Sequence, residues 1–336
     1  MLFYKGLEDI IFTRNQLFKC DELVILSGYL GPTPVERLKE LPFHTTVIYG
    51  MYGAEGIQSS IHTALLQKHQ SIDNINILYS TMPVHSKCYV WKNKGEVVHA
   101  LVGSANFSVN GLTIPYKEVL AETTVDTFEP LDDYLKLVKE KAISCENAVV
   151  RKNKSKARQP HESADFNKDI CSLPLYSTKN GNKYVPAASG INWCLSSNAN
   201  VTPGDGYVPI PAECIRKYPQ LFPKKQIVPV RDPSTGRSQR HNDAIEVLWD
   251  DGTIMTCLLE GNSELNLDGI RGGPKDLYPK NLASHPRKNV LGNYLRKRLG
   301  VTTDHKVTIA DLAAYGRDTI DISLMGEGIY YFDFSV

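Results

Sequence analysis

The chain has 336 residues, which predicts two domains, and its net charge of +1 hides an asymmetry between its two halves. Its 42% hydrophobic and 22% charged residues are ordinary for a globular protein, and no apolar stretch approaches membrane-spanning length. Charges within Met1–Ile10 exclude a signal peptide, and seven scattered cysteines without a C-x-x-C pair argue against a disulfide framework or a zinc site. We therefore expect a cytoplasmic protein with reduced thiols.

Strand-like and helix-like segments alternate through residues 1–150. Short apolar runs predict strands, and runs with apolar residues every three to four positions predict helices. The alternation predicts an α/β domain with a mixed sheet flanked by helices. We expect strands at Leu23–Ser27, Thr45–Tyr49, Ile75–Leu78, Cys88–Trp91, Val97–Val102 and Tyr116–Glu122, and helices at Pro34–Leu41, Ile57–His69 and Phe128–Ile143.

The fourth and fifth of these strands should form a hairpin around the turn signal at residues 92–96. His85 and Lys87 stand at alternate positions and should project from one face. The return strand would bring Ser104 and Asn106 back beside them. An imidazole, an ammonium, a hydroxyl and an amide then converge, which suits chemistry on a phosphate diester.

A basic linker is expected at residues 151–170. Residues 1–150 hold 13 Lys and Arg against 17 Asp and Glu, a balance of −4, whereas residues 151–336 hold 25 against 20, a balance of +5. The basic excess begins with the polar run Arg151-Lys152-x-Lys154-x-Lys156-x-Arg158, which lacks hydrophobic periodicity. The run is either a solvated connector or one that also touches nucleic-acid phosphates.

Short strands dominate residues 171–336 and predict a mainly-β domain, a small open barrel with few helices. Asp250-Asp251-Gly252 should form a tight hairpin turn between two of them. The expected strands are Tyr207–Ile210, Ala244–Trp249, Thr253–Leu259 and Ile329–Phe334, and the expected helices are Ala212–Tyr218, Val290–Leu299 and Ile309–Tyr315.

The pattern His85-x-Lys87 followed by Gly103-Ser104-x-Asn106 resembles the phospholipase D superfamily, whose motif runs H-x-K, then an Asp, then G-S-x-N. Lys92 stands where that family usually has its Asp, a departure found among nucleases that carry one motif per chain.

This resemblance implies a nuclease that forms a covalent phosphohistidine at His85 and needs no metal ion or other cofactor. The second histidine would come from the other subunit of a homodimer formed through the N-terminal domain. Lys87, Ser104 and Asn106 would stabilise the phosphoryl oxygens, and Glu118, expected on the following strand, would orient the imidazole.

The C-terminal half is similar to the NgoFVII-type restriction endonucleases, which are phospholipase-D-like nucleases related to BfiI. That similarity implies a B3-like DNA-binding domain, an open pseudobarrel, over residues 171–336. It is carried by Asn192-Trp193, Tyr207–Pro211, Asn289–Arg296, Arg298–Val301, Val307-Thr308, Asp311-Leu312, Tyr315-Gly316-Arg317 and Tyr330–Ser335.

B3-like domains grip the major groove of double-stranded DNA with two arms, here expected at Asn192–Asp205 and Glu260–Asn281. Asn, Ser, Arg, Lys and Glu side chains in such arms can read base edges. The resemblance also allows a separately encoded ATPase subunit and a cognate methyltransferase as partners. The candidate DNA contacts are Asn192, Trp193, Ser196, Ser197, Asn198, Asn262, Glu264, Asn266, Arg271, Lys275 and Lys280.

Two other functions are compatible with the sequence. In the first, the chain is a sequence-specific DNA-binding protein whose phospholipase-D-like domain serves only for dimerisation. In the second, it hydrolyses a lipid or a small diester, which the single motif and the basic second half disfavour. Replacing His85 tests the first, and the salt dependence of binding tests the second.

Overall fold

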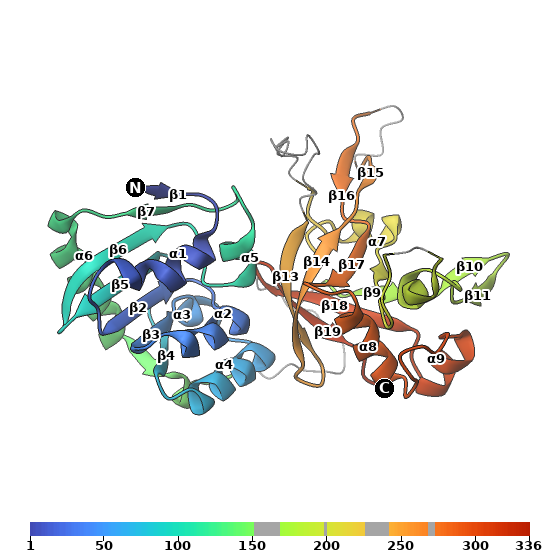
Figure 1. Ribbon diagram of the computed structural model, residues 1–336, viewed down its shortest axis with the longest axis horizontal. Helices are drawn as coiled ribbons and strands as arrows, with labels where there is room; N and C mark the ends of the chain where they lie inside the picture. Colours follow the sequence, from blue (N-terminus) through green and yellow to red (C-terminus); the bar gives the residue numbers. More distant parts are fainter. Residues whose placement is uncertain (151–168, 198–199, 226–241, 268–272) are drawn as a thin grey trace. The chain divides into compact units, whose positions relative to one another are not determined.

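A computed structural model describes residues 1–150, 169–197, 200–225, 242–267 and 273–336 (Figure 1). These residues form two compact units: an N-terminal unit of residues 1–150 together with Gly326–Ile329, and a C-terminal unit of the other described residues from 169 onward. Most of the predicted linker lies outside the described residues. In the described ranges, no helix is long and apolar enough to cross a membrane.

The N-terminal unit is built on one eight-stranded mixed sheet. Three neighbouring strands of the sheet run parallel to one another, and the remaining neighbours pair antiparallel. The predicted mixed α/β sheet is therefore confirmed. In order across the sheet, the strands are β1 (Leu2–Phe3), β7 (Leu120–Glu122), β6 (Glu96–Gly103), β5 (Lys87–Asn93), β2 (Glu22–Ser27), β3 (His44–Tyr49), β4 (Ile75–Ser80) and β8 (Ala142–Ser144).

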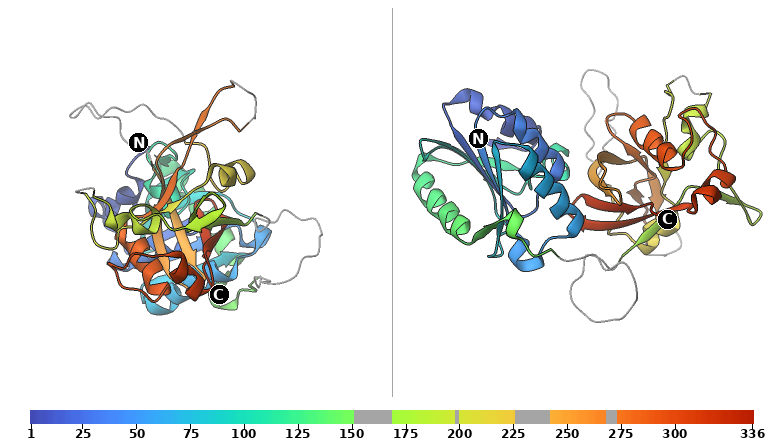
Figure 2. Two further views of the ribbon diagram at one scale, coloured as in Figure 1. Left: turned by 90° about the vertical axis from the view of Figure 1, so that its right-hand side faces the viewer. Right: turned by 90° about the horizontal axis from the view of Figure 1, so that it is seen from below.

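Helices cover both faces of this sheet (Figure 2). One face carries α6 (Phe128–Glu140), whose buried Leu135 and Val138 pack against Val24 and Leu26 of β2. The alternate residues of β2 are buried on the opposite face, as expected for a central strand with helices on both sides. That face is covered by α1 (Leu7–Thr13), α2 (Pro32–Arg37) and α4 (Ser59–Ser71), with the short helices α3 (Tyr52–Glu55) and α5 (Val109–Thr113) at its edge.

Two expectations for this unit are wrong in part. The predicted strand Tyr116–Glu122 is limited to β7, because Tyr116 has a positive φ of 64° that no extended strand accommodates. The predicted helix Phe128–Ile143 ends at Glu140, and the residues after it form the edge strand β8 beside β4. Strand pairing at the open edge of the sheet thus outweighs the helical pattern there.

The C-terminal unit is a curled seven-stranded sheet. Its two edge strands lie against each other, which makes a nearly closed pseudobarrel and confirms the prediction of a small open barrel. In order, the strands are β12 (Val208–Pro209), β17 (Asn281–Ser284), β14 (Ile254–Glu260), β13 (Asp243–Trp249), β19 (Ile329–Asp333), β18 (Thr319–Gly326) and β9 (Cys171–Pro174). Three of these strands, β9, β17 and β18, were not expected from the sequence.

Three helices accompany this barrel close to their predicted positions: α7 (Ala212–Lys217), α8 (Asn289–Arg298) and α9 (Ile309–Tyr315). Two hairpins extend from it, β10–β11 (Ser177–Lys179 and Asn182–Tyr184) and β15–β16 (Ser263–Leu265 and Asp276–Tyr278). The predicted turn at Asp250 joins β13 to β14, and the Asp250 carboxylate accepts two hydrogen bonds from Arg298 at 3.1 and 2.8 Å. Asp250 therefore supports the barrel rather than a site.

Candidate functional site

The β5–β6 hairpin brings the two halves of the candidate motif together. Lys87, the first residue of β5, pairs with Gly103, the last residue of β6. Both residues of the turn, Lys94 and Gly95, have positive φ, at 53° and 86°, which fits a two-residue hairpin connection. The expected hairpin is therefore present, and it places residues 85–87 beside the segment that begins at Ser104.

His85 and Lys87 are in direct contact. The Lys87 ammonium lies 2.9 Å from Nδ1 and 3.2 Å from Nε2 of His85, and it donates to the His85 carbonyl at 2.6 Å. The His85 side chain is exposed, whereas Lys87 is only 5% exposed. Burial lowers the pKa of Lys87, and the negative charge of Glu118 acts in the opposite direction.

Asn106 reaches the same place from the return strand. A methyl group built on Gly28 would lie 3.0 Å from Cδ2 of His85 and 3.3 Å from Oδ1 of Asn106. Both side chains are thus within 3.3 Å of one point, at the end of β2. His85, Lys87 and Asn106 form one cluster, as the sequence predicted.

Ser104 and Glu118 are placed less directly. Ser104 pairs with Val119, donating its main-chain N–H at 3.0 Å and accepting from the Val119 N–H through its hydroxyl at 3.1 Å. Glu118 stands two residues before β7, so its expected place on a strand is wrong. Within the described ranges, neither residue makes a hydrogen bond with His85, and Glu118 acts on the cluster through its charge on Lys87.

Lys92, which replaces the usual Asp of the motif, has a structural partner. Its ammonium pairs with Asp132 of α6, and Lys136 of the same helix lies 3.1 Å from that carboxylate. Because the Lys92 charge is held by α6, the departure from the motif adds no cation to the cluster around His85.

In the predicted first arm, Asn192 is a core residue. It is fully buried, and its amide donates to Pro186 O at 3.0 Å and Val307 O at 2.8 Å and accepts from Val307 N at 2.9 Å. Since every polar atom of this side chain is occupied inside the unit, the prediction that it contacts DNA is wrong.

The other residues of this arm differ in exposure. The half-exposed Trp193 packs edge-on against Tyr207 with ring centroids 5.8 Å apart. The Ser196 hydroxyl is buried and has no hydrogen-bond partner in the parts of the chain that are described, while Ser197 is exposed. Asn198 lies outside the described residues.

The predicted second arm is the β15–β16 hairpin and its flanks. The exposed Asn262 precedes β15, the exposed Glu264 lies within it, and Asn266 follows it. The exposed Lys275 precedes β16. These four residues are brought together on one projecting element, whereas Arg271 lies outside the described residues.

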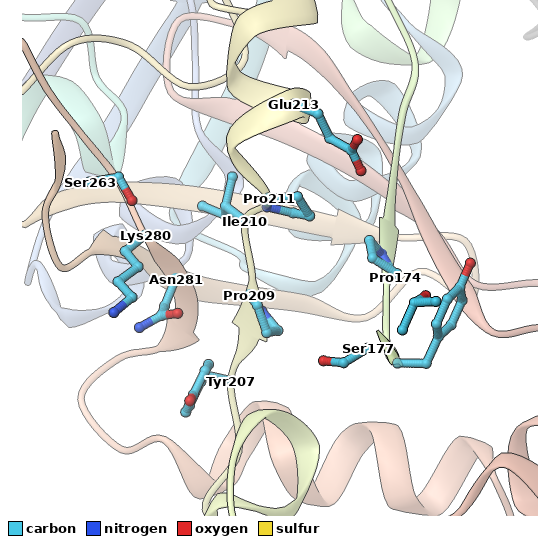
Figure 3. Close-up of a pocket in the computed structure, with 12 residues that line it drawn as sticks. Pro174, Ser177, Tyr207, Pro209, Ile210, Pro211, Glu213, Ser263, Lys280 and Asn281 are labelled. Carbon is cyan, nitrogen blue, oxygen red and sulfur yellow. The ribbon is translucent and has the colours of Figure 1, made fainter. Parts of the chain in front are cut away.

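An open groove of about 510 Å³ lies at the foot of this hairpin (Figure 3). Lys280 and Asn281 line one wall, with Tyr207 nearby, and Pro174 and Ser177 line the other. Lys280, a predicted DNA contact, thus projects beside a concave surface that carries polar and aromatic groups. No group of three or more His, Cys, Asp or Glu side chains that could hold a metal ion occurs among the residues described.

Comparisons with known proteins address both units. Residues 5–152 match the family model of the NgoFVII restriction endonuclease N-terminal PLD domain, and residues 167–326 match that of the NgoFVII C-terminal B3-like DNA-binding domain. Among solved structures, NucT from Helicobacter pylori is 15% identical with a TM-score of 0.31, over 43% of this chain and 97% of NucT. Polyphosphate kinase from Porphyromonas gingivalis is 16% identical with a TM-score of 0.29, over 45% of this chain and 23% of the kinase. No curated protein matches the chain.

Proposed function

Because the chain belongs to the NgoFVII restriction endonuclease family, we propose that it cleaves double-stranded DNA at specific sites through a covalent phosphohistidine at His85. The observation that carries this proposal is the cluster of His85, Lys87 and Asn106, formed where β2, β5 and the segment after β6 meet. These groups supply a nitrogen nucleophile and two kinds of hydrogen-bond donor, which a phosphate diester requires.

In the first step, an unprotonated ring nitrogen of His85 attacks phosphorus, and the bond from phosphorus to the leaving oxygen breaks. Lys87 and Asn106 donate hydrogen bonds to the non-bridging oxygens, whose charge grows in the transition state. Ser104 adds its hydroxyl proton to this set, since the hydroxyl oxygen already accepts from Val119 N. Water then attacks the phosphohistidine, a proton of the water passes to the group that protonated the leaving oxygen, and the phosphorus–nitrogen bond breaks, which releases the 5′ or 3′ phosphate and free His85.

The leaving oxygen needs a proton when its bond breaks, and His85 cannot give one while it acts as the nucleophile. One H-x-K motif occurs in the chain. We therefore infer a homodimer through the N-terminal unit, in which the partner subunit's His85 protonates the leaving oxygen. The cationic and amide donors make a divalent metal unnecessary for this chemistry.

Glu118 has a modified role in this proposal. Its charge opposes the lowering of the Lys87 pKa by burial, so it favours the protonated form of Lys87, which binds phosphate. We propose that Glu118 orients the His85 ring in the substrate complex, after the Lys87 ammonium has turned toward the phosphate.

For recognition, we propose that the β15–β16 hairpin enters the major groove of DNA. The exposed Asn262 amide, Glu264 carboxylate and Lys275 ammonium, together with the partly exposed Asn266, match the donors and acceptors that base edges present. The proposed contacts are Trp193, Ser196, Ser197, Asn262, Glu264, Asn266, Lys275 and Lys280, together with Asn198 and Arg271 outside the described residues. We also propose that the protein is cytoplasmic and that its partners include a separately encoded ATPase subunit and a cognate methyltransferase.

The experiment compares the parent chain with His85→Ala on unmethylated plasmid DNA, with and without ATP, in excess chelator. The parent should cut in chelator, and His85→Ala should bind the same DNA without cutting it. Cutting by His85→Ala, or complete loss of parental cutting in chelator, would refute the proposed mechanism. Equal DNA binding without cutting by both chains would favour a DNA-binding protein with a non-catalytic dimerisation domain.

A further inference from the structure

The segment Ser27-Gly28-Tyr29 lies directly under the proposed catalytic side chains. It begins with Ser27, the last residue of β2, and Leu26 of the same strand pairs with Cys88 of β5, so the end of β2 adjoins the position of Lys87. The segment belongs to no motif identified in the sequence. Its contacts with His85 and Asn106 nevertheless determine how both side chains are oriented.

The main chain of Tyr29 fixes the direction of the Asn106 amide. Asn106 is 4% exposed, and its Oδ1 accepts a hydrogen bond from the Tyr29 N–H at 3.2 Å. A main-chain N–H can donate only to the oxygen of a side-chain amide, so the Asn106 oxygen faces Tyr29 and its NH₂ group points the other way. Nδ2 makes no hydrogen bond within the described residues and is available to donate to a phosphoryl oxygen.

Ser27 ties this arrangement to the loop that carries Asn106. The fully buried hydroxyl donates to Tyr29 O at 2.6 Å and accepts from Phe107 N at 2.9 Å. Gly31 N donates to Phe107 O at 2.8 Å. These hydrogen bonds hold the Ser27–Tyr29 segment and the loop around Phe107 in one geometry, although Ser27 and Phe107 are 80 residues apart in the sequence.

Gly28 leaves the space that His85 and Asn106 occupy. A methyl group at this position would lie 3.0 Å from the His85 ring and 3.3 Å from the Asn106 amide, closer than relaxed contacts allow. The φ of Gly28 is outside the left-handed region, so alanine would not strain the backbone. An alanine here would therefore act on the two catalytic side chains themselves.

The ring of Tyr29 forms a wall beside the imidazole. Its centroid lies 6.0 Å from that of His85 at an interplanar angle of 78°, an edge-on arrangement. The Tyr29 hydroxyl donates to Glu55 of α3, whose two carboxylate oxygens are both 3.0 Å away. The half-buried ring is thus anchored at one end while its edge faces the exposed His85.

We propose that Tyr29 and Gly28 are positioning residues for DNA cleavage: the Tyr29 main chain aims the Asn106 amide, and its anchored ring above Gly28 holds His85 in line with phosphorus. The inference rests on the proposed function for its catalytic consequence. Displacement of a catalytic group by about 1 Å typically lowers a rate on the order of 100-fold, which sets the size of the expected effect.

The test measures single-turnover cleavage of supercoiled plasmid DNA by Gly28→Ala, Tyr29→Leu and Tyr29→Phe. The first two should be slower by about 100-fold, with DNA affinity and thermal unfolding midpoint unchanged, whereas Tyr29→Phe keeps the ring and should lose only about fivefold. Tyr49→Phe is the matched control, because Tyr49 packs edge-on against Tyr29 with ring centroids 6.2 Å apart but makes no ring contact with His85 in the described structure. Rates within twofold of the parent for Gly28→Ala and Tyr29→Leu, or losses matched by losses in DNA affinity or stability, would overturn the proposal.

A second readout does not depend on cleavage. The ring resonances of His85 in ¹⁵N-histidine-labelled protein should shift in Gly28→Ala and Tyr29→Leu and stay in place in Tyr49→Phe. Unchanged His85 resonances in the first two variants would also overturn the positioning role. If the parent chain cuts no DNA, the proposed function fails, while these resonances still decide whether the segment holds the ring.

Discussion

The Lys87 ammonium lies against the imidazole of His85, 2.9 Å from Nδ1 and 3.2 Å from Nε2. An ammonium only donates hydrogen bonds, so this contact requires a ring nitrogen without a proton. An unprotonated nitrogen is also what a nucleophilic histidine needs. In the free protein this contact holds the Lys87 cation beside the imidazole, and the proposed attack requires the ammonium to turn toward the phosphate so that the ring nitrogen is released.

The pH dependence of cleavage should report Lys87. Burial lowers the pKa of this ammonium below its ordinary 10.5, and the charged form is lost as the pH rises through the lowered value. The single-turnover rate should therefore fall on the alkaline side before pH 10.5 is reached. Lys87→Gln should be slower by about 100-fold and lack this alkaline decline, as expected when one transition-state donor is removed. A parental rate that stays flat to pH 10.5 would contradict the assignment.

Mixed dimers should show that two histidines serve one site. Since the partner subunit's His85 is proposed to supply the proton, a His85→Ala subunit should inactivate the dimer that it joins. Adding excess His85→Ala chain to the parent, followed by subunit exchange, should depress cleavage in proportion to the fraction of mixed dimers. Cleavage that depends only on the parental concentration would show that each subunit acts alone.

Asn192→Ala should destabilise the C-terminal unit without acting on DNA directly. The change leaves the N–H and C=O of Val307 without their partners in a fully buried position. Each buried group left unsatisfied costs about 1–3 kcal/mol, so the free energy of unfolding should fall by about 3 kcal/mol. Denaturant titration measures this, with the exposed Ser197→Ala as the control. Weaker DNA binding by Asn192→Ala at unchanged stability would restore this residue to the recognition surface.

Lys280→Ala should weaken DNA binding most at low salt. If its ammonium neutralises one phosphate, the slope of log affinity against log salt concentration should become shallower by about 1. Lys136→Ala is the matched control, because Lys136 is exposed on α6 of the N-terminal unit and pairs with Asp132 and Asp133. An equal slope for the parent and Lys280→Ala would remove Lys280 from the phosphate contacts.

Short-range sequence patterns predicted the part of the site that the β5–β6 hairpin forms. The turn and the β-rich runs around it specify the β5–β6 hairpin, and pairing of Lys87 with Gly103 then brings the motif together. The strand expected to carry Glu118 failed because Tyr116 adopts a positive φ, which no hydrophobic pattern reveals.

Short-range patterns could not predict the contacts between segments that lie far apart in the sequence. Asn192 stands in a polar stretch that reads as a loop, yet its amide binds Val307, 115 residues away. The Ser27–Tyr29 segment begins at the last residue of an ordinary buried strand, and its hydrogen bond from Tyr29 to Asn106 spans 77 residues. The sequence offers only Gly28, a small residue at the end of this strand, as an indication. Its role becomes clear from the structure, where His85 and Asn106 lie close to it.

The stereochemical course at phosphorus tests the covalent phosphohistidine most directly. Cleavage of DNA that carries a phosphorothioate of known configuration at the scissile position, in ¹⁸O-labelled water, records whether one or two displacements occur. Two in-line displacements, one by His85 and one by water, predict overall retention of configuration. Inversion would show that water attacks the DNA in a single step and would contradict the account.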